Sequence, residues 1–191
     1  MPQKAEYRNA IRSKKLIRSA FIELLQTKTL DKITVTNIVE TAELNRGTFY
    51  AHYADINMLI QSIEDEVVHS MYKLVSEEEN LYLLKDPLPL FLKISQYLEQ
   101  NQELIIALMS SQTTNLFIVQ LPDLIAKHLA SSEDIDKEVR NSASFKERCY
   151  FYAGGAGSLY MAWFRGTVSG SLDDMAYMLA EIIRQGWQLE Q

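Results

Sequence analysis

Cysteine, proline and glycine are scarce in this chain, whose 191 residues include one cysteine, four prolines and seven glycines. The single cysteine, Cys149, excludes an internal disulfide and a multi-cysteine zinc site, and this usage fits a reducing compartment. A small core residue is the favoured interpretation of Cys149. Because strong turn formers are few while 47% of the residues are hydrophobic and 23% are charged, the composition favours an all-α globular fold.

Long apolar runs are also missing. No run reaches the roughly 18 to 20 uncharged apolar residues of a membrane helix, and residues 1–15 lack the apolar centre of a signal peptide. We therefore expect a soluble, cytoplasmic protein with no membrane partner. The uncharged run Cys149–Phe164 predicts a helix that is buried on most sides. Its glycines weaken the helix by roughly 1 kcal/mol each, and close approach to a neighbouring helix would compensate.

Charge is unevenly distributed along the chain. The net charge is -6, but residues 1–60 hold nine Lys or Arg against six Asp or Glu, whereas residues 61–191 hold ten against nineteen. A basic segment joined to an acidic one suits a local phosphate-binding surface, because counterion release depends on local cations rather than on total charge. A solvated charged face explains the pattern at least equally well, so charge alone only suggests DNA as a partner.

Three short helices are predicted before residue 55. Ser13 is a candidate N-cap for a helix that ends near Gln26, because apolar residues follow it at helical spacing. Thr34 is expected to cap a second helix, and Asn45 a third that contains Phe49. Short helices joined by tight turns are typical of a helix-turn-helix, in which Phe49 belongs to the core.

Further helices are predicted after this module. A long amphipathic helix starts at Asp55, and Pro87 and Pro89 interrupt the pattern because proline removes a backbone donor. Ser171 and Asp174 have the spacing of a capping box at the start of the last helix. The intervening helices are expected over residues 90–99, 102–110, 115–130 and from 145 onwards.

The segment ITVTNIVETAELNRGTFYAHY, residues 33–53, carries the most specific pattern in the chain. It resembles the DNA-binding signature of the TetR family, and the resemblance extends over about residues 13–60. The segment FYAGGAGSLYMAWF near the C-terminus is similar to the family's second domain in the branch that includes dihydroxyacetone-kinase regulators. The resemblance implies an N-terminal arm and a helix-turn-helix domain over residues 1–55, followed by a helical ligand-binding and dimerisation domain over residues 56–191. The basic arm before Ser13 could add minor-groove or backbone contacts, although a disordered solvated tail explains it about as well.

The motif residues have physically plausible roles on double-stranded DNA. Arg46 can donate two hydrogen bonds to a guanine, and the Thr48 methyl can contact a thymine. Gly47 removes a side chain where the helix would approach the groove, and Tyr50 and His52 have polar ends suited to phosphates. Caps at helix N-termini can also contact DNA, which adds Thr34, Thr36 and Asn45 to the predicted interface.

Each of these residues also has a simpler interpretation. A capping residue can serve only to cap its helix, and an isolated histidine is often only a packing residue. Two positions depart from the family pattern. Glu43 stands in the turn where glycine is usual, which costs little if its φ is not positive. Ile56 stands where a phosphate-binding lysine is common, and this removes one backbone contact.

Other classes of function receive little support. The three histidines lack metal-ligand spacing, and there is no Gly-rich phosphate loop after a strand and no serine nucleophile in a recognisable turn. We therefore expect no enzyme, no catalytic residue, no metal and no cofactor. An interaction protein that keeps the fold but has lost DNA binding is an alternative, and so is an activator rather than a repressor.

The second domain is predicted to pair two chains and to hold an unidentified small-molecule effector. A homodimer would place two recognition helices about 34 to 36 Å apart on a near-palindromic operator, and repression released by the effector is the family's usual outcome. The candidate dimer residues are Gly154, Gly157, Trp163, Leu179 and Ile183. The candidate effector residues are Tyr97, Met109, Phe117 and Tyr152, although a plain hydrophobic core explains them better.

Overall fold

The computed structural model describes residues 2–77, 85–109, 120–133 and 135–188, and all regular structure in these ranges is helical. The prediction of an all-α fold is confirmed. The chain forms two compact units, Met1–Glu66 with Glu103–Thr113, and Val67–Gln102 with Thr114–Gln191. The predicted domain boundary near residue 55 stays a prediction. The first division between the two compact units falls between Glu66 and Val67, within a long helix.

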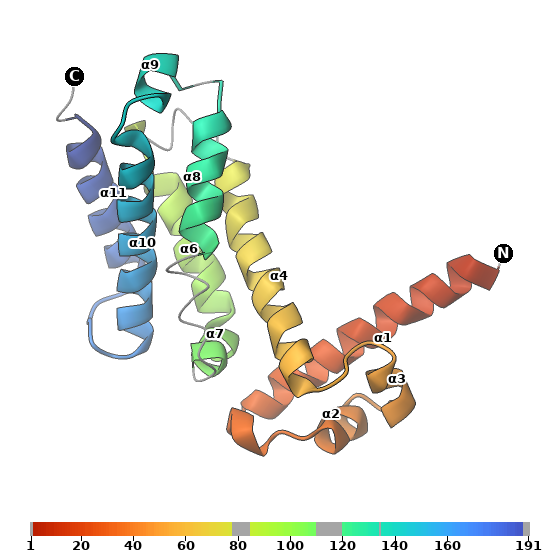
Figure 1. Cartoon of the computed structure of the whole chain (residues 1–191). Helices are drawn as coiled ribbons and strands as arrows, with labels where there is room; N and C mark the ends of the chain where they lie inside the picture. The colour runs from red at the N-terminus through yellow and green to blue at the C-terminus, as the bar shows by residue number, and fades with distance from the viewer. Residues whose placement is uncertain (1, 78–84, 110–119, 134, 189–191) are drawn as a thin grey trace. The chain divides into compact units, whose positions relative to one another are not determined.

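The N-terminal unit is built on helix α1, Pro2–Leu25, against which α2 and α3 pack (Figure 1). Ile17 and Phe21 are fully buried on its inner face. The prediction that Ser13 caps this helix is wrong, because the helix continues to Pro2 and Ser13 lies in its interior. There the Ser13 hydroxyl donates to the carbonyls of Asn9 and Ala10, at 2.9 and 3.1 Å, as serines inside helices commonly do.

Helices α2, Val35–Thr41, and α3, Arg46–Tyr50, begin at the two predicted caps. The Thr34 hydroxyl accepts from the backbone N–H of Asn37, whose side chain accepts from the Thr34 N–H in return. Asn45 accepts from the backbone N–H of Thr48 at 2.8 Å. Phe49 has no exposed surface, which confirms it as part of the core.

The turn between α2 and α3 is closed by a Schellman motif. The Leu44 N–H donates to the Val39 carbonyl at 2.9 Å, and the Glu43 N–H donates to the Glu40 carbonyl at 3.2 Å. This arrangement requires a left-handed residue, and Glu43 has φ of 52°. A residue with a Cβ costs roughly 1 to 2 kcal/mol there, so the condition under which Glu43 would be harmless is not met.

Helix α4, Ile56–Ser76, follows a third polar cap, in which Asp55 accepts from the Met58 N–H at 2.9 Å. In the N-terminal unit, Glu66 of α4 pairs with Arg18 of α1 at 2.7 Å. Helix α7, Gln102–Met109, joins the same unit, and its Glu103 accepts from the Gln26 side chain at 2.8 Å.

The C-terminal unit is a helical bundle in which α6 packs on α11, and α10 packs on both α8 and α11 (Figure 1). The predicted capping box at Ser171 and Asp174 is present, with its two bonds at 2.9 and 3.0 Å. The first residues of the helix predicted from 115 lie outside the described residues. The helices are α6 Leu88–Gln100, α8 Leu121–Ser131, α9 Lys137–Arg140, α10 Phe145–Phe164 and α11 Leu172–Gln188.

Helix α10 departs from expectation in one respect. The prediction that it is buried on most sides is wrong for the single chain, because Phe151 is 73% exposed and Gly155 is exposed as well. No described residue outside its own helical turn lies within 4 Å of where a Cβ would stand on Gly154 or Gly155, so no described neighbouring helix approaches them. The helix ends at a Schellman motif whose left-handed residue is Gly166, with φ of 70°.

Candidate functional site

The N-terminal ends of α2 and α3 place polar groups together on the surface of the N-terminal unit. The Arg46 guanidinium donates to the Thr36 hydroxyl at 2.7 Å, which joins the first turns of the two helices. Arg46, Asn45 and Thr34 are all exposed. A guanidinium has five N–H donors, so the bond to Thr36 leaves others for a further partner.

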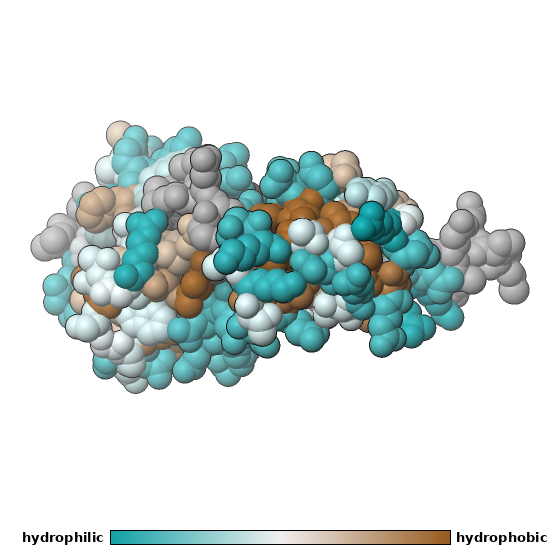
Figure 2. Space-filling view, turned by 90° about the horizontal axis from the view of Figure 1, so that it is seen from below, coloured by the Kyte–Doolittle hydropathy of each residue, from teal (hydrophilic) through white to brown (hydrophobic). Residues whose placement is uncertain are grey.

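The remaining motif residues of α3 extend this surface. A Cβ on Gly47 would stand 3.1 Å from the cap oxygen of Asn45, so glycine also gives room for the cap, a reason that the sequence did not reveal. The Thr48 hydroxyl lies 3.1 Å from the same oxygen, and Tyr50 is 56% exposed. Figure 2, seen from below the view of Figure 1, shows hydrophilic residues over much of this face, with hydrophobic ones between them.

His52 is directed differently from the other predicted contacts. Its Nε2 lies 2.6 Å from the Ser13 hydroxyl of α1, in a part-buried position. Nε2 donates or accepts in this bond according to the tautomer of the His52 ring. Burial, and then the nearby Lys14 ammonium, lower the pKa of His52 below its ordinary value of 6.5. In this structure the side chain ties the end of the motif to α1.

The basic residues before the motif lie on α1 and not on an extended arm. Arg8, Arg12, Lys14 and Lys15 are exposed along this helix. A helix is about 10 to 12 Å wide with its side chains, whereas the minor groove of DNA is about 6 Å wide. In this conformation the segment suits contact with phosphates and not insertion into the minor groove.

An apolar cavity of about 110 Å³, partly open to solvent, lies in the C-terminal unit. The described helices α6, α8, α10 and α11 contribute to it, together with the second half of α4. Its described lining residues are Met71, Val75, Pro87, Leu90, Phe91, Ile94, Leu98, Leu121, Ile125, Leu129, Cys149, Tyr152, Ala153, Ala156, Gly157, Tyr160, Met161, Phe164 and Ile183.

The few polar atoms in this lining already have partners or resist ionisation. The Tyr160 hydroxyl lies 3.1 Å from the Ser95 hydroxyl, which donates to the Leu172 carbonyl at 2.8 Å. Burial raises the pKa of Tyr160 to about 12 and that of the Cys149 thiol to about 11. The Tyr152 ring packs on Gly186, where a Cβ would stand only 1.8 Å from the hydroxyl oxygen.

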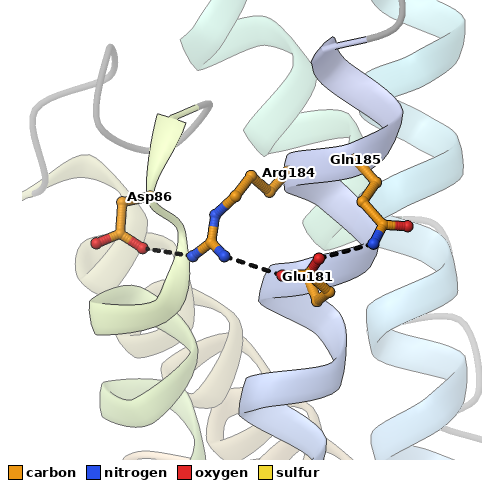
Figure 3. Close-up of polar contacts among 4 residues, drawn as sticks. All are labelled: Asp86, Glu181, Arg184 and Gln185. Carbon is orange, nitrogen blue, oxygen red and sulfur yellow. Dashed lines mark hydrogen bonds and ion pairs between the residues drawn. The ribbon is translucent and has the colours of Figure 1, made fainter.

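Charged residues occur next to the cavity but not in its described lining. The Arg184 guanidinium bonds to Asp86 at 3.2 Å and to Glu181 at 2.9 Å, and Glu181 also accepts from Gln185 (Figure 3). Asp86 precedes Pro87 and Arg184 follows Ile183, and both of these apolar neighbours line the cavity. The pair therefore links α11 to the segment before α6 at the solvent-exposed edge of the cavity.

Of the three predicted effector residues that the structure describes, one lies at this cavity. Tyr152 is in the lining, and Phe117 lies outside the described residues. Tyr97 is half-buried at the border of the apolar stripe of α6 and is not in the lining. Met109 is on α7, which belongs to the N-terminal unit. The sequence missed the true lining because apolar core positions and cavity positions follow the same helical period.

The predicted dimer residues are also divided by the structure. Gly157 and Ile183 line the cavity, and Leu179 is buried within its own unit. Trp163 is half-buried, and its Nε1 donates to the Gly170 carbonyl at 2.8 Å. The apolar side chains left exposed on α10 and α11 are instead Phe151, Tyr177, Met178 and Ile182. The apolar spacing of Met178 and Ile182 on α11 was the sequence signal that could have indicated these exposed side chains.

The described residues contain no cluster of three His, Cys, Asp or Glu that could hold a metal ion. Within the same residues, no helix is both long and apolar enough to cross a membrane.

A capped helix pair on a three-helix unit, joined to a helical bundle, is the architecture of a helix-turn-helix transcription regulator. Residues 85–185 match the family model for the TetR C-terminal domain, described as "Transcriptional regulator C-terminal region". Since this match covers more than half of the chain, the protein belongs to the TetR family of transcriptional regulators.

The chain is similar to a regulator of Lactococcus lactis subsp. lactis (strain IL1403) named "HTH-type dhaKLM operon transcriptional activator DhaS". The two are 26% identical over 128 residues, which is 66% of this chain and 65% of the relative, slightly less than two thirds of its length.

Solved structures share the fold over most of the chain. The dihydroxyacetone kinase operon activator DhaS superposes with a TM-score of 0.68 at 20% identity, over 93% of this chain and 97% of that one. FadR of Thermus thermophilus, described as a TetR family transcriptional repressor in complex with lauroyl-CoA, has a TM-score of 0.59 at 16% identity, over 93% and 96% of the chains.

Proposed function

We propose that this TetR-family regulator binds double-stranded DNA sequence-specifically, with α3 in the major groove. The observation that carries the proposal is the exposed, doubly capped helix pair, in which Arg46 and Thr36 meet at 2.7 Å. Exposed helix N-termini suit phosphates, and an arginine at the start of the second helix suits a guanine edge.

The geometry supports distinct roles for the motif residues. Arg46 is the main base reader, and its bond to Thr36 holds the guanidinium near the start of α3. The Thr48 hydroxyl is directed at Asn45, so its methyl is the group available to a thymine. Thr34, Thr36, Asn45 and Tyr50 position the unit on phosphates, and Gly47 keeps the backbone accessible. His52 acts through Ser13, as a link that orients α1 and α3.

A homodimer follows as a second part of the proposal. Phe151 on α10 and Met178 and Ile182 on α11 are 73%, 43% and 47% exposed, which is a large apolar area to leave in water. Gly154 and Gly155 leave open space beside Phe151 into which a partner's side chain can fit. Pairing of two chains through α10 and α11 would present two copies of α3 to a near-palindromic operator.

The cavity of the C-terminal unit is the proposed effector site. Helices connect it along the chain to the DNA-binding unit, because α6 lines the cavity and leads through Asn101 into α7, and α4 runs from one unit into the other. An effector changes DNA affinity only if it binds one conformation better than another. The expected repressor outcome stays a prediction, and the relative DhaS is named an activator.

The experiment that tests the proposal is recovery of genomic DNA on the purified full chain, followed by sequencing and a gel shift on the enriched fragments. We expect a near-palindromic site and binding that weakens steeply with salt, because phosphate contacts release counterions. Ultracentrifugation of the same sample should give a dimer at micromolar concentration. Absence of any enriched site would contradict DNA binding and favour an interaction protein with the same fold.

A further inference from the structure

The lining of the cavity restricts the chemistry of what it can hold. Among its described lining residues only Cys149, Tyr152 and Tyr160 have a polar side-chain atom, and none is charged. A charged or strongly polar group that enters such a space loses its water and must find partners there. The cavity offers such a group almost no hydrogen-bonding partners.

The available polar atoms are already engaged. The Tyr160 hydroxyl has the Ser95 hydroxyl at 3.1 Å and the Phe91 carbonyl at 3.4 Å. The Tyr152 ring is packed on Gly186. The Cys149 thiol is uncharged at neutral pH, and burial raises its pKa further, to about 11. A ligand therefore gains contact with carbon atoms and little else.

The volume gives the second restriction. At about 110 Å³ the cavity is somewhat smaller than an engineered protein cavity of roughly 150 Å³ that stays dry and binds benzene. A ligand of about six carbons matches this volume.

We infer that the cavity binds a compact, uncharged, apolar molecule of about six carbons, and that it rejects polyols and carboxylates of similar size. The ordered hydrogen bonds of the Tyr160 and Ser95 hydroxyls and the absence of charge in the described lining both point to this class. The inference rests on the proposed function, since it names the class of ligand for the proposed effector site.

Benzene, glycerol and hexanoate are suitable probes, because they share a small size and differ in polarity and charge. The thermal unfolding midpoint of the full chain is measured with each, and affinity is measured by calorimetry. At a benzene concentration of about ten times its Kd, the midpoint should rise by roughly 3 to 5 °C. Glycerol and hexanoate at equal concentration should leave it unchanged. Equal shifts with all three would overturn the inference.

A cavity-filling variant gives the structural control. Ala153→Leu adds three carbons to the lining and should abolish the benzene shift, whereas Ala130→Leu, the same change on the exposed surface of α8, should keep it. If Ala153→Leu lowers the midpoint without a probe, Ile125→Phe fills the cavity from α8 instead. A benzene shift that persists in a folded, filled variant would place the benzene elsewhere and overturn the inference.

DNA binding of the same samples separates this inference from the proposed function. Intact DNA binding without any benzene shift would overturn the ligand class alone. A benzene shift that Ala153→Leu removes, in a protein that binds no DNA, would support the ligand class and contradict the proposed function.

Discussion

The helix pair of the N-terminal unit and the cavity of the C-terminal unit satisfy their polar groups in opposite ways. At α2 and α3 the polar side chains are exposed, and bonds such as that from Arg46 to Thr36 can be exchanged for water or for another partner. At the cavity the hydroxyls of Ser95 and Tyr160 are buried and bonded to each other. A buried polar group without a partner is costly, so these bonds resist exchange.

This difference separates two kinds of recognition. The helix pair is suited to a partner that brings many hydrogen-bonding groups, such as a base edge or a phosphate. The cavity is suited to a partner that brings none. Substitutions in the helix pair should therefore change DNA affinity without changing the packing around the cavity.

The largest effect is expected for Arg46→Ala. Loss of a two-bond contact to a base should weaken operator binding by about 1 to 3 kcal/mol, or roughly 5- to 150-fold, measured by fluorescence anisotropy on the selected site. Because Arg46 is exposed, the thermal midpoint should not change. Thr36→Val, which removes the acceptor of the Arg46 bond and a proposed phosphate contact, should weaken binding less. An unchanged affinity in Arg46→Ala would exclude it as the base reader.

In the C-terminal unit, Gly186→Ala should lower the free energy of unfolding by up to about 2 kcal/mol, since overpacking outweighs the gain in helix propensity. Its Cβ would stand 1.8 Å from the Tyr152 hydroxyl oxygen and 2.8 Å from the ring carbon that bears it. Tyr152→Phe should relieve part of this cost in a double-mutant cycle measured by urea denaturation. Gly155→Ala, whose Cβ meets no described atom within 4 Å in its own chain, is the control for helix propensity, measured at a protein concentration low enough to keep the chain monomeric. Additive effects in the cycle would argue against the contact.

The two Schellman motifs provide a smaller test, with one in each unit. Glu43→Gly should stabilise the protein by about 1 kcal/mol, because glycine adopts φ of 52° without the Cβ penalty. Gly166→Ala should destabilise it by about 1 kcal/mol for the converse reason, at φ of 70°. Both are measured by urea denaturation. A loss of stability in Glu43→Gly would mean that contacts of the glutamate side chain outweigh the backbone strain.

The smallest effect is a pH dependence from His52. Its pKa is below 6.5 in the folded chain, mainly because of burial, so the unfolded chain takes up the proton first as the pH falls. The stability that neutral His52 contributes is full above about pH 6.5 and is lost as the pH falls towards the folded pKa. Denaturation between pH 5 and 7.5 should show a shallower slope in His52→Gln than in the wild type. Parallel curves would remove His52 from the pH response.

The sequence predicted the helix-turn-helix well, because its signals are local. Thr34 and Asn45 cap helices through atoms three residues away, and Phe49 is apolar in a polar surrounding. The Ser13 cap failed because a serine can bond to the carbonyl four residues before it inside a helix, and the sequence does not separate the two uses.

The cavity and the exposed face of α10 could not be predicted from the sequence in the same way. Ile183 and Leu179 occupy the same apolar stripe of α11, yet one lines the cavity and the other is buried in the bundle. Helical period distinguishes inside from outside, but it does not distinguish a filled core from a hollow one. That difference depends on side chains of several helices at once, and so it emerges only from the packed structure.

The left-handed glutamate at position 43 has a consequence for how such proteins are recognised. A search pattern that demanded glycine in this turn would reject the chain, although its backbone hydrogen bonds from Leu44 to Val39 and from Glu43 to Glu40 are intact. The turn requires a left-handed backbone torsion angle, and glycine is only the residue that adopts it most often.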